Sequence, residues 1–165
     1  MINIVLIEPE IPQNAGNIMR TCAATGCTLY MVKPLGFSTD DKHYKRAGLD
    51  YHEYATVKII DSFKELQENN PNIPFFFATT KAPHSYSEVK FPKDCFIVFG
   101  KESYGISETI LKNNYEQCIR IPMKKETRSL NLATSVGIIT FEALRQNNFP
   151  GLTDEGQLTG RTEID

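Results

Sequence analysis

Apolar runs rich in β-branched and aromatic residues recur along the chain as far as Pro122 and predict buried strands. Several of the runs are continuous rather than alternating, which is typical of strands covered on both faces. The six runs are INIVLIE (Ile2–Glu8), TLYMV (Thr28–Val32), TVKII (Thr56–Ile60), PFFFAT (Pro74–Thr79), CFIVFG (Cys95–Gly100) and CIRIP (Cys118–Pro122).

Segments with helical spacing lie between most of these runs. The predicted helices are Asn14–Thr25, Ser62–Asn69, Ser107–Asn113 and Asn131–Asn147. Asn14 can cap the first helix and Gly26 ends it, while Ser62 and Glu65 form a capping box at the second. This alternation predicts an α/β domain with a mainly parallel six-stranded sheet flanked by helices.

The first turns of the last predicted helix contain mostly small residues. Ala133, Thr134, Ser135 and Gly137 stand where a core helix would carry bulk, directly after a loop with Arg128. Small residues let something come close, and either a ligand or a packed backbone fits this pattern.

The chain has 165 residues, which favours a single domain. We assign that domain to residues 1–151 and expect the polar segment 152–165 to be a frayed tail. The stretch Gly36–Tyr54 is too long and charged for an ordinary connection, so we expect a functional loop with a short helix there.

Composition excludes several classes of protein. No apolar run reaches the roughly 20 residues needed to cross a bilayer, and the N-terminus lacks signal-peptide features, so we expect a cytoplasmic protein without a membrane partner. The four cysteines form no C-x-x-C pair and are interpreted as reduced structural thiols. The three histidines are scattered, so no metal site is expected.

Charge gives a mixed indication about nucleic acid. The formal net charge of −2 argues mildly against a nucleic-acid partner. Two local basic clusters, Lys42–Arg46 and Lys124–Arg128, could override it, although a basic cluster taken alone is more often a solvated face.

Three loops at the carboxyl ends of predicted strands carry candidate chemistry, since ligands of open α/β sheets bind at that edge. After the first strand, one helix face carries Gln13, Asn17 and Arg20. This face could hold a phosphate or ribose, or could be an ordinary solvent-exposed surface. In the second loop, FGKESYG, two glycines permit close backbone approach and Glu102 can orient a basic partner. In the third loop, Ser129 and Asn131 can cap the final helix.

Familiar nucleotide and hydrolase motifs are missing from the sequence. Neither G-x-G-x-x-G nor G-x-x-x-x-G-K-[ST] follows a strand, which disfavours a Rossmann dinucleotide site and a P-loop. G-x-S-x-G is also missing, which disfavours an α/β-hydrolase.

The three loops together resemble a known family. N-x-G-N-x-x-R at Asn14–Arg20, F-G-x-E-x-x-G at Phe99–Gly105 and I-P-M-x(4)-R-S-L-N-L at Ile121–Leu132 are similar to the three motifs of the SPOUT RNA methyltransferases. The opening IVLIEPEIPQNAGNIMRTCAATG and the segment DDKHYKRAGLDYHEY are most similar to the TrmL (YibK) subfamily. The resemblance covers residues 1–151, nearly the whole chain.

The resemblance implies a fold, a reaction and a cofactor. Members transfer a methyl group from S-adenosylmethionine to the ribose 2'-hydroxyl of the wobble nucleotide of tRNA, a cytidine or a modified uridine, here expected in leucine isoacceptors. They work as homodimers, and a C-terminal trefoil knot is implied although knots are rare. In such a knot, the small residues at the start of the last helix face both the cofactor and a threaded backbone.

Carried onto this sequence, the resemblance implies a set of site residues. The cofactor pocket is expected to comprise Ala78, Thr79, Gly100, Glu102, Ile121, Met123, Ser129 and Leu130. Arg20, with Asn14 and Asn17, is expected to face the target ribose as the catalytic group, and Lys42, Lys45, Arg46, Lys124 and Arg128 are expected to contact RNA.

Arg20 is a doubtful general base, because a guanidinium is effectively always protonated. Clamping a phosphate, or stabilising the developing alkoxide, is physically easier. Two alternatives to tRNA methylation stay open: a ribosomal RNA target, and an RNA- or nucleotide-binding module without catalysis.

Overall fold

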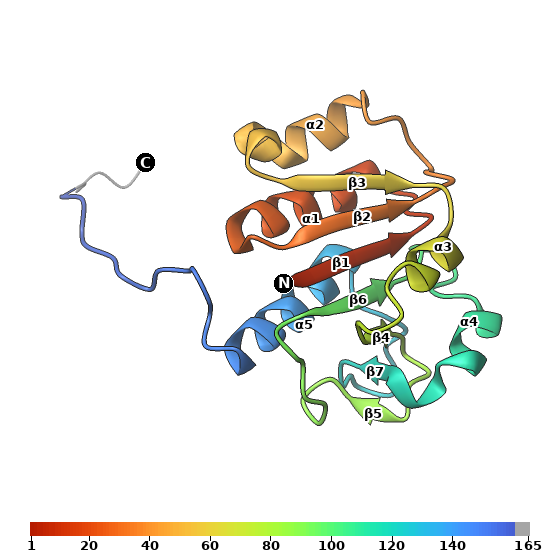
Figure 1. The fold of residues 1–165 in the computed structure, drawn as a ribbon. Helices are drawn as coiled ribbons and strands as arrows, with labels where there is room; N and C mark the ends of the chain where they lie inside the picture. The colour runs from red at the N-terminus through yellow and green to blue at the C-terminus, as the bar shows by residue number, and fades with distance from the viewer. Residues whose placement is uncertain (161–165) are drawn as a thin grey trace.

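The computed structural model describes residues 1–160, apart from the side chains of residues 49 and 50. Figure 1 shows the arrangement of its elements. The strands are β1 (Ile2–Ile7), β2 (Thr28–Val32), β3 (Thr56–Ile60), β4 (Phe75–Ala78), β5 (His84–Ser85), β6 (Cys95–Phe99) and β7 (Cys118–Arg120). The helices are α1 (Pro12–Thr25), α2 (Lys42–Gly48), α3 (Phe63–Glu68), α4 (Glu108–Asn113) and α5 (Leu132–Gln146), with short 3-10 turns η1 (Leu49–Glu53) and η2 (Tyr115–Gln117).

The sheet is parallel throughout its described pairings. Its order is β3-β2-β1-β6-β4-β7-β5, so it has seven strands rather than the six that the sequence predicts. The additional strand, β5, has only two residues and pairs through His84 opposite Ile119. Such a short polar strand carries no hydrophobic pattern, which is why the sequence did not predict it.

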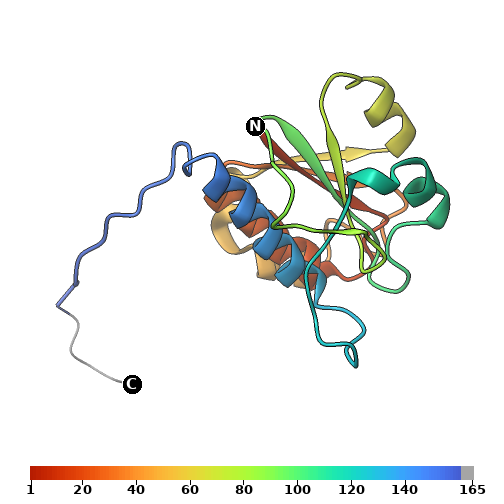
Figure 2. The same ribbon diagram turned by 90° about the horizontal axis from the view of Figure 1, so that it is seen from below.

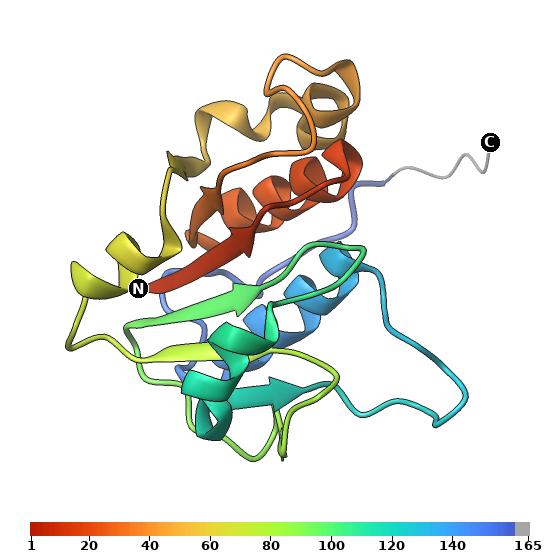
Figure 3. The same ribbon diagram turned by 90° about the vertical axis from the view of Figure 1, so that its right-hand side faces the viewer.

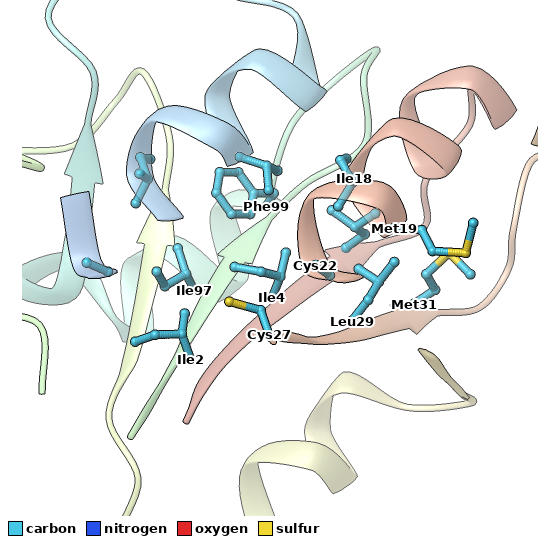
Figure 4. Packing of buried hydrophobic residues seen from close by; sticks show 14 of the residues in the cluster. Ile2, Ile4, Ile18, Met19, Cys22, Cys27, Leu29, Met31, Ile97 and Phe99 are labelled. Carbon is cyan, nitrogen blue, oxygen red and sulfur yellow. The ribbon is translucent and has the colours of Figure 1, made fainter. Parts of the chain in front are cut away.

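Helices cover both faces of the sheet and make three layers, as Figure 2 shows. On one face α1, α2 and α5 enclose a core that includes Ile139 of α5. Figure 4 shows Ile4, Ile18 and Met31 of the same core. On the other face, α3 and α4 cover a second core around the sheet. The central strands β1 and β6 are buried on both faces, as their continuous apolar runs predict.

The segment 36–54 forms α2 and η1 and packs directly on α1, so the short helix expected there is confirmed. Close approach of the two helices depends on glycines. A Cβ at Gly16 would lie 2.6 Å from the Tyr44 carbonyl oxygen, and a Cβ at Gly48 would collide with the Met19 side chain. The Tyr44 hydroxyl also donates to the Met19 sulfur at 3.4 Å.

Helix ends follow the sequence signals with one correction. Ser62 caps α3 by accepting from the Glu65 amide, Gly26 ends α1 in the left-handed region, and Asn131 caps α5 by accepting from the Thr134 amide at 3.2 Å. The predicted cap at Asn14 is wrong. α1 begins two residues earlier at Pro12, which fixes a helical φ at the first position, and the Asn14 side chain turns to other partners.

After α5 the described chain leaves the domain. Leu152 still packs against the first core, and residues 153–160 are exposed without regular structure, as Figure 1 shows. Residues 161–165 of the expected tail lie outside the described part of the chain. Within residues 1–160, no helix is long and apolar enough to cross a membrane.

Candidate active site

The three loops that carry the sequence motifs meet at the carboxyl edge of the sheet. They follow β1, β6 and β7, and the last of them projects from the body of the domain between β7 and α5 (Figure 3). Between them lies a cavity of about 500 Å³, within the range typical of small-molecule sites. All eight residues predicted to form the cofactor pocket line it: Ala78, Thr79, Gly100, Glu102, Ile121, Met123, Ser129 and Leu130.

Glu102 joins the three loops through uncharged donors. Its carboxylate accepts from the backbone amides of Glu10 at 2.8 Å and Ile11 at 3.1 Å, and from the Asn14 side-chain amide at 3.1 Å. The side-chain oxygen of Asn14 in turn accepts a hydrogen bond from the side-chain amide of Asn131 at 2.9 Å. The expectation that Glu102 orients a basic partner is therefore wrong: the described partners are amide N–H groups, which a carboxylate holds strongly.

A second pair of contacts fastens the first two loops together. The Lys101 ammonium donates to Glu8 at 2.7 Å, while Ser103 donates to Glu10 through its backbone amide at 2.9 Å and its hydroxyl at 2.8 Å. The Ser103 hydrogen bonds lower the pKa of Glu10, and the Glu8 carboxylate raises the pKa of Lys101. Both groups therefore stay charged near neutral pH.

Gly100 is required by the loop itself. A Cβ built there would collide with the backbone of Gly105 and Ile106. Gly105 has a φ of 71° and donates its amide to the Lys101 carbonyl at 2.8 Å, which closes a tight turn over Gly100. The two glycines of the motif therefore serve one turn that forms the wall of the cavity.

The residues in the first turns of α5, which include the small side chains noted in the sequence, face two different environments. Leu132 and Ser135 line the cavity, so part of this helix start faces the ligand space. Gly137 does not: a Cβ there would have no described atom within 4 Å. We expected a threaded backbone of the same chain to pack against the small residues of this helix, but no described backbone lies beside Gly137.

Arg20 lies apart from the cavity. Gln13, Asn17 and Arg20 are exposed on one face of α1, as their spacing predicts, but Asn17 and Arg20 do not line the cavity. Asn14 does line it and is buried, at 6% exposure, so the structure does not place Asn14 beside Arg20 on that face. The Arg20 guanidinium carbon lies 5.1 Å from the centre of the Tyr51 ring.

The five candidate RNA-binding residues fall into two separate groups. Lys42, Lys45 and Arg46 are exposed on α2, which packs toward the β3 edge, whereas Lys124 and Arg128 are exposed on the loop that follows β7 (Figure 3). Lys45 is engaged by Asp40 at 2.9 Å. One chain therefore does not bring the two groups together.

Several residues of this region were not singled out from the sequence. Glu8, Glu10 and Ser103 fasten the loops, while Lys101 and Tyr104 also line the cavity. The alternating carboxylates of E-P-E directly after a strand were the available signal. Among residues 1–160, no three His, Cys, Asp or Glu side chains are grouped to hold a metal ion, and all four cysteines are free and buried.

Comparison with known proteins agrees with this architecture. Residues 1–141 match the SpoU rRNA Methylase family. A relative from Bacillus subtilis (strain 168) is 48% identical over 154 residues, 92% of this chain and 96% of that protein. The tRNA (cytidine(34)-2'-O)-methyltransferase of Yersinia pestis is 46% identical over 159 residues, 92% of this chain and 97% of that protein.

Solved structures give the same result. A structure described as "Structural insights into the 2-OH methylation of C/U34 on tRNA" is 40% identical with a TM-score of 0.86, covering 90% of this chain and 97% of that one. The α/β fold with its three motif loops is therefore that of a methylase-type domain. The chain belongs to the SpoU rRNA methylase family, which confirms the resemblance to SPOUT RNA methyltransferases.

Proposed function

We propose that this protein is an S-adenosylmethionine-dependent methyltransferase that modifies the ribose 2'-hydroxyl of nucleotide 34 of tRNA, a cytidine or a modified uridine. The observation that carries the proposal is the cavity at the meeting point of the three motif loops, in a chain 46% identical to an enzyme named for that reaction. Leucine isoacceptors remain the predicted substrates, and the cytoplasm the predicted location.

The cavity fits the proposed cofactor in size and chemistry. A volume of about 500 Å³ suits a ligand of this class, and its wall includes the apolar side chains of Ile121, Met123 and Leu130. Backbone groups of Ala78 and Ile121 can read the adenine edge, and the tight turn at Gly100 lets backbone approach the ligand. When bound, S-adenosylmethionine supplies an electrophilic methyl group on sulfur.

The residues of this chain have separable tasks in the proposed reaction. The cavity fixes the methyl donor, and alignment with the attacking oxygen can contribute about 7–11 kcal/mol. Guanidinium groups are poor general bases, so we assign Arg20 to holding a phosphate or the developing alkoxide rather than to removing the proton. Asn14 has both ends of its amide engaged, so we assign it to positioning Glu102 and Asn131.

A ribosomal RNA target is the alternative that a specific observation favours, because the matching family is described as an rRNA methylase family. Transfer of labelled methyl from S-adenosylmethionine to bulk tRNA and to ribosomal RNA separates the possibilities. We expect label only in tRNA, at the 2'-oxygen of nucleotide 34. Label in ribosomal RNA alone would favour the alternative, and binding of RNA without transfer would indicate a non-catalytic module.

We further propose a homodimer, supported by an unpartnered stripe on α5. Thr134, Gly137, Ile138 and Phe141 lie at helical spacing on one side of α5, and Phe141 is 48% exposed. A small residue with open space beside it, flanked by the half-buried Ile138 and the exposed Phe141, suits an isologous contact between two copies. A dimer would also bring the α2 and β7–α5 basic groups of different chains to one RNA.

Sedimentation tests the dimer. Phe141→Lys should give a monomer at micromolar concentration while the parent protein sediments as a dimer. Tyr115→Lys is the matched control, because Tyr115 is also 48% exposed but lies on η2. A monomeric parent protein would contradict the proposal. The C-terminal knot implied by the family likewise remains a proposal, to be tested by tracing the path of residues 121–131 in an experimental structure.

A further inference from the structure

Arg20 has a close aromatic neighbour far along the chain. Its guanidinium carbon lies 5.1 Å from the centre of the Tyr51 ring, within the roughly 6 Å over which an aromatic face attracts a cation. Arg20 is exposed and Tyr51 is half-buried, so the ring forms a floor under the charged group. Among the described side chains, the Tyr51 ring is the recorded neighbour of the guanidinium, and a contact with a ring face leaves N–H donors free to point at a ligand.

The position of Tyr51 is fixed by the packing of the segment that carries it. α2 and η1 are held on α1 by the close approaches at Gly16 and Gly48. The Tyr51 carbonyl accepts from the backbone amides of Tyr54 and Ala55, each at 3.0 Å, which closes the end of η1. The ring beneath Arg20 therefore belongs to a packed element.

This arrangement matters for an arginine that must meet a ribose–phosphate in one orientation. A long exposed side chain samples many rotamers, and fixing it on ligand binding costs conformational entropy. A ring beside the guanidinium limits the positions of the charged group without occupying its N–H donors, so a bidentate contact needs less reorganisation. Lys42, Lys45 and Arg46 stand on α2, in the same packed segment as Tyr51.

We propose that Tyr51 is a positioning residue that holds the Arg20 guanidinium over its ring, in place for the ribose–phosphate of the target nucleotide. The inference rests on the proposed function, in which Arg20 acts on the RNA. Tyr51 acts through Arg20 and contacts neither the cofactor nor the reacting atoms. It would therefore affect the transfer step while leaving the cofactor cavity unchanged.

The test compares Tyr51→Leu, Tyr51→Phe, Arg20→Ala and the double variant Arg20→Ala/Tyr51→Leu. Single-turnover transfer is measured at saturating tRNA, together with S-adenosylmethionine affinity and thermal stability. We expect Tyr51→Leu to be about five- to tenfold slower and Tyr51→Phe to stay within about twofold, because the phenylalanine ring keeps the cation–π contact. Tyr54→Leu is the matched control, since Tyr54 is 74% exposed in the same segment.

The double variant gives the sharpest result. If Tyr51 acts only through Arg20, adding Tyr51→Leu to Arg20→Ala should slow transfer no further. A further slowing by the same factor would overturn the inference, as would Tyr51→Phe behaving like Tyr51→Leu. Normal turnover of Tyr51→Leu beside a slow Arg20→Ala would overturn this inference alone. Normal turnover of Arg20→Ala would overturn the role of Arg20 and the inference with it.

Discussion

The cavity and the exposed face of α1 are held by different kinds of contact. At the cavity, loops that lie 92 to 117 residues apart along the chain are fixed by a carboxylate, two asparagines and a turn that has no room for a side chain. On the α1 face, Arg20 is exposed and rests on one aromatic ring. The cavity should therefore respond to changes of shape and hydrogen bonding, and the α1 face to changes of charge and orientation.

Gly100→Leu is the strongest test of the cavity. The side chain would collide with the backbone of Gly105 and Ile106, so the turn must open and the wall of the cavity must move. We expect S-adenosylmethionine binding to be lost in calorimetry, with the fold retained by circular dichroism. Gly156→Leu, where a side chain meets open space, should bind normally. Unchanged affinity in folded Gly100→Leu would refute the placement of the cofactor.

Arg20→Ala tests the α1 face by removing charge. Since Arg20 does not line the cavity, S-adenosylmethionine affinity should stay nearly unchanged. Single-turnover methyl transfer should fall by roughly a hundred- to a thousandfold, the cost of a lost transition-state contact. Near-normal turnover at saturating tRNA would show that Arg20 has no catalytic role and is an ordinary solvent-exposed residue.

Arg20→Lys shows which property of the side chain matters. It keeps the charge but loses the planar fork. If charge alone acts, lysine should recover much of the rate; if the contact is bidentate, lysine should behave almost like alanine. Measuring tRNA affinity separately distinguishes weaker binding from slower transfer.

Glu102→Gln should have an intermediate effect that acts on geometry. Both carboxylate oxygens accept from N–H donors, so an amide in their place would set its own NH₂ against a donor. The donors are partly buried, so leaving one unpaired should cost about 1 kcal/mol, the low end of the range for buried donors. We therefore expect lower thermal stability and S-adenosylmethionine binding weaker by up to roughly tenfold. Glu53→Gln, at an exposed glutamate, is the control. Normal stability and affinity would mean that the loops are fixed by other contacts.

The two regions also differ in how far the sequence predicts them. The strands buried on both faces were predicted from continuous apolar runs. The edge of the sheet that carries the site was predicted from the loops that follow those strands, whereas the eight predicted residues that line the cavity came from the resemblance of those loops to the SPOUT motifs. The partners of Glu102 were not predicted, because they lie about ninety residues away and depend on the sheet order. Nor was the Tyr51–Arg20 contact, which needs the packing of α2 on α1.

The smallest expected effect concerns the basic side chains on α2. Lys45 pairs with Asp40 at 2.9 Å, and that hydrogen bond lowers the pKa of Asp40, so the Asp40 carboxylate offsets the positive charge of Lys45. Arg46 is exposed, and none of the described ion pairs includes it. If α2 contacts phosphates, Arg46→Ala should weaken tRNA binding a few-fold and reduce the salt slope by about one.

Lys45→Ala is the comparison within the same helix, because removing it also frees Asp40 to repel phosphate. Replacing both residues, Asp40→Asn/Lys45→Ala, removes the pair without changing net charge and should leave affinity close to that of the parent protein. Binding isotherms at several salt concentrations measure all of these variants. A salt slope that Arg46→Ala leaves unchanged would exclude α2 from the RNA contact and leave that role to the loop between β7 and α5.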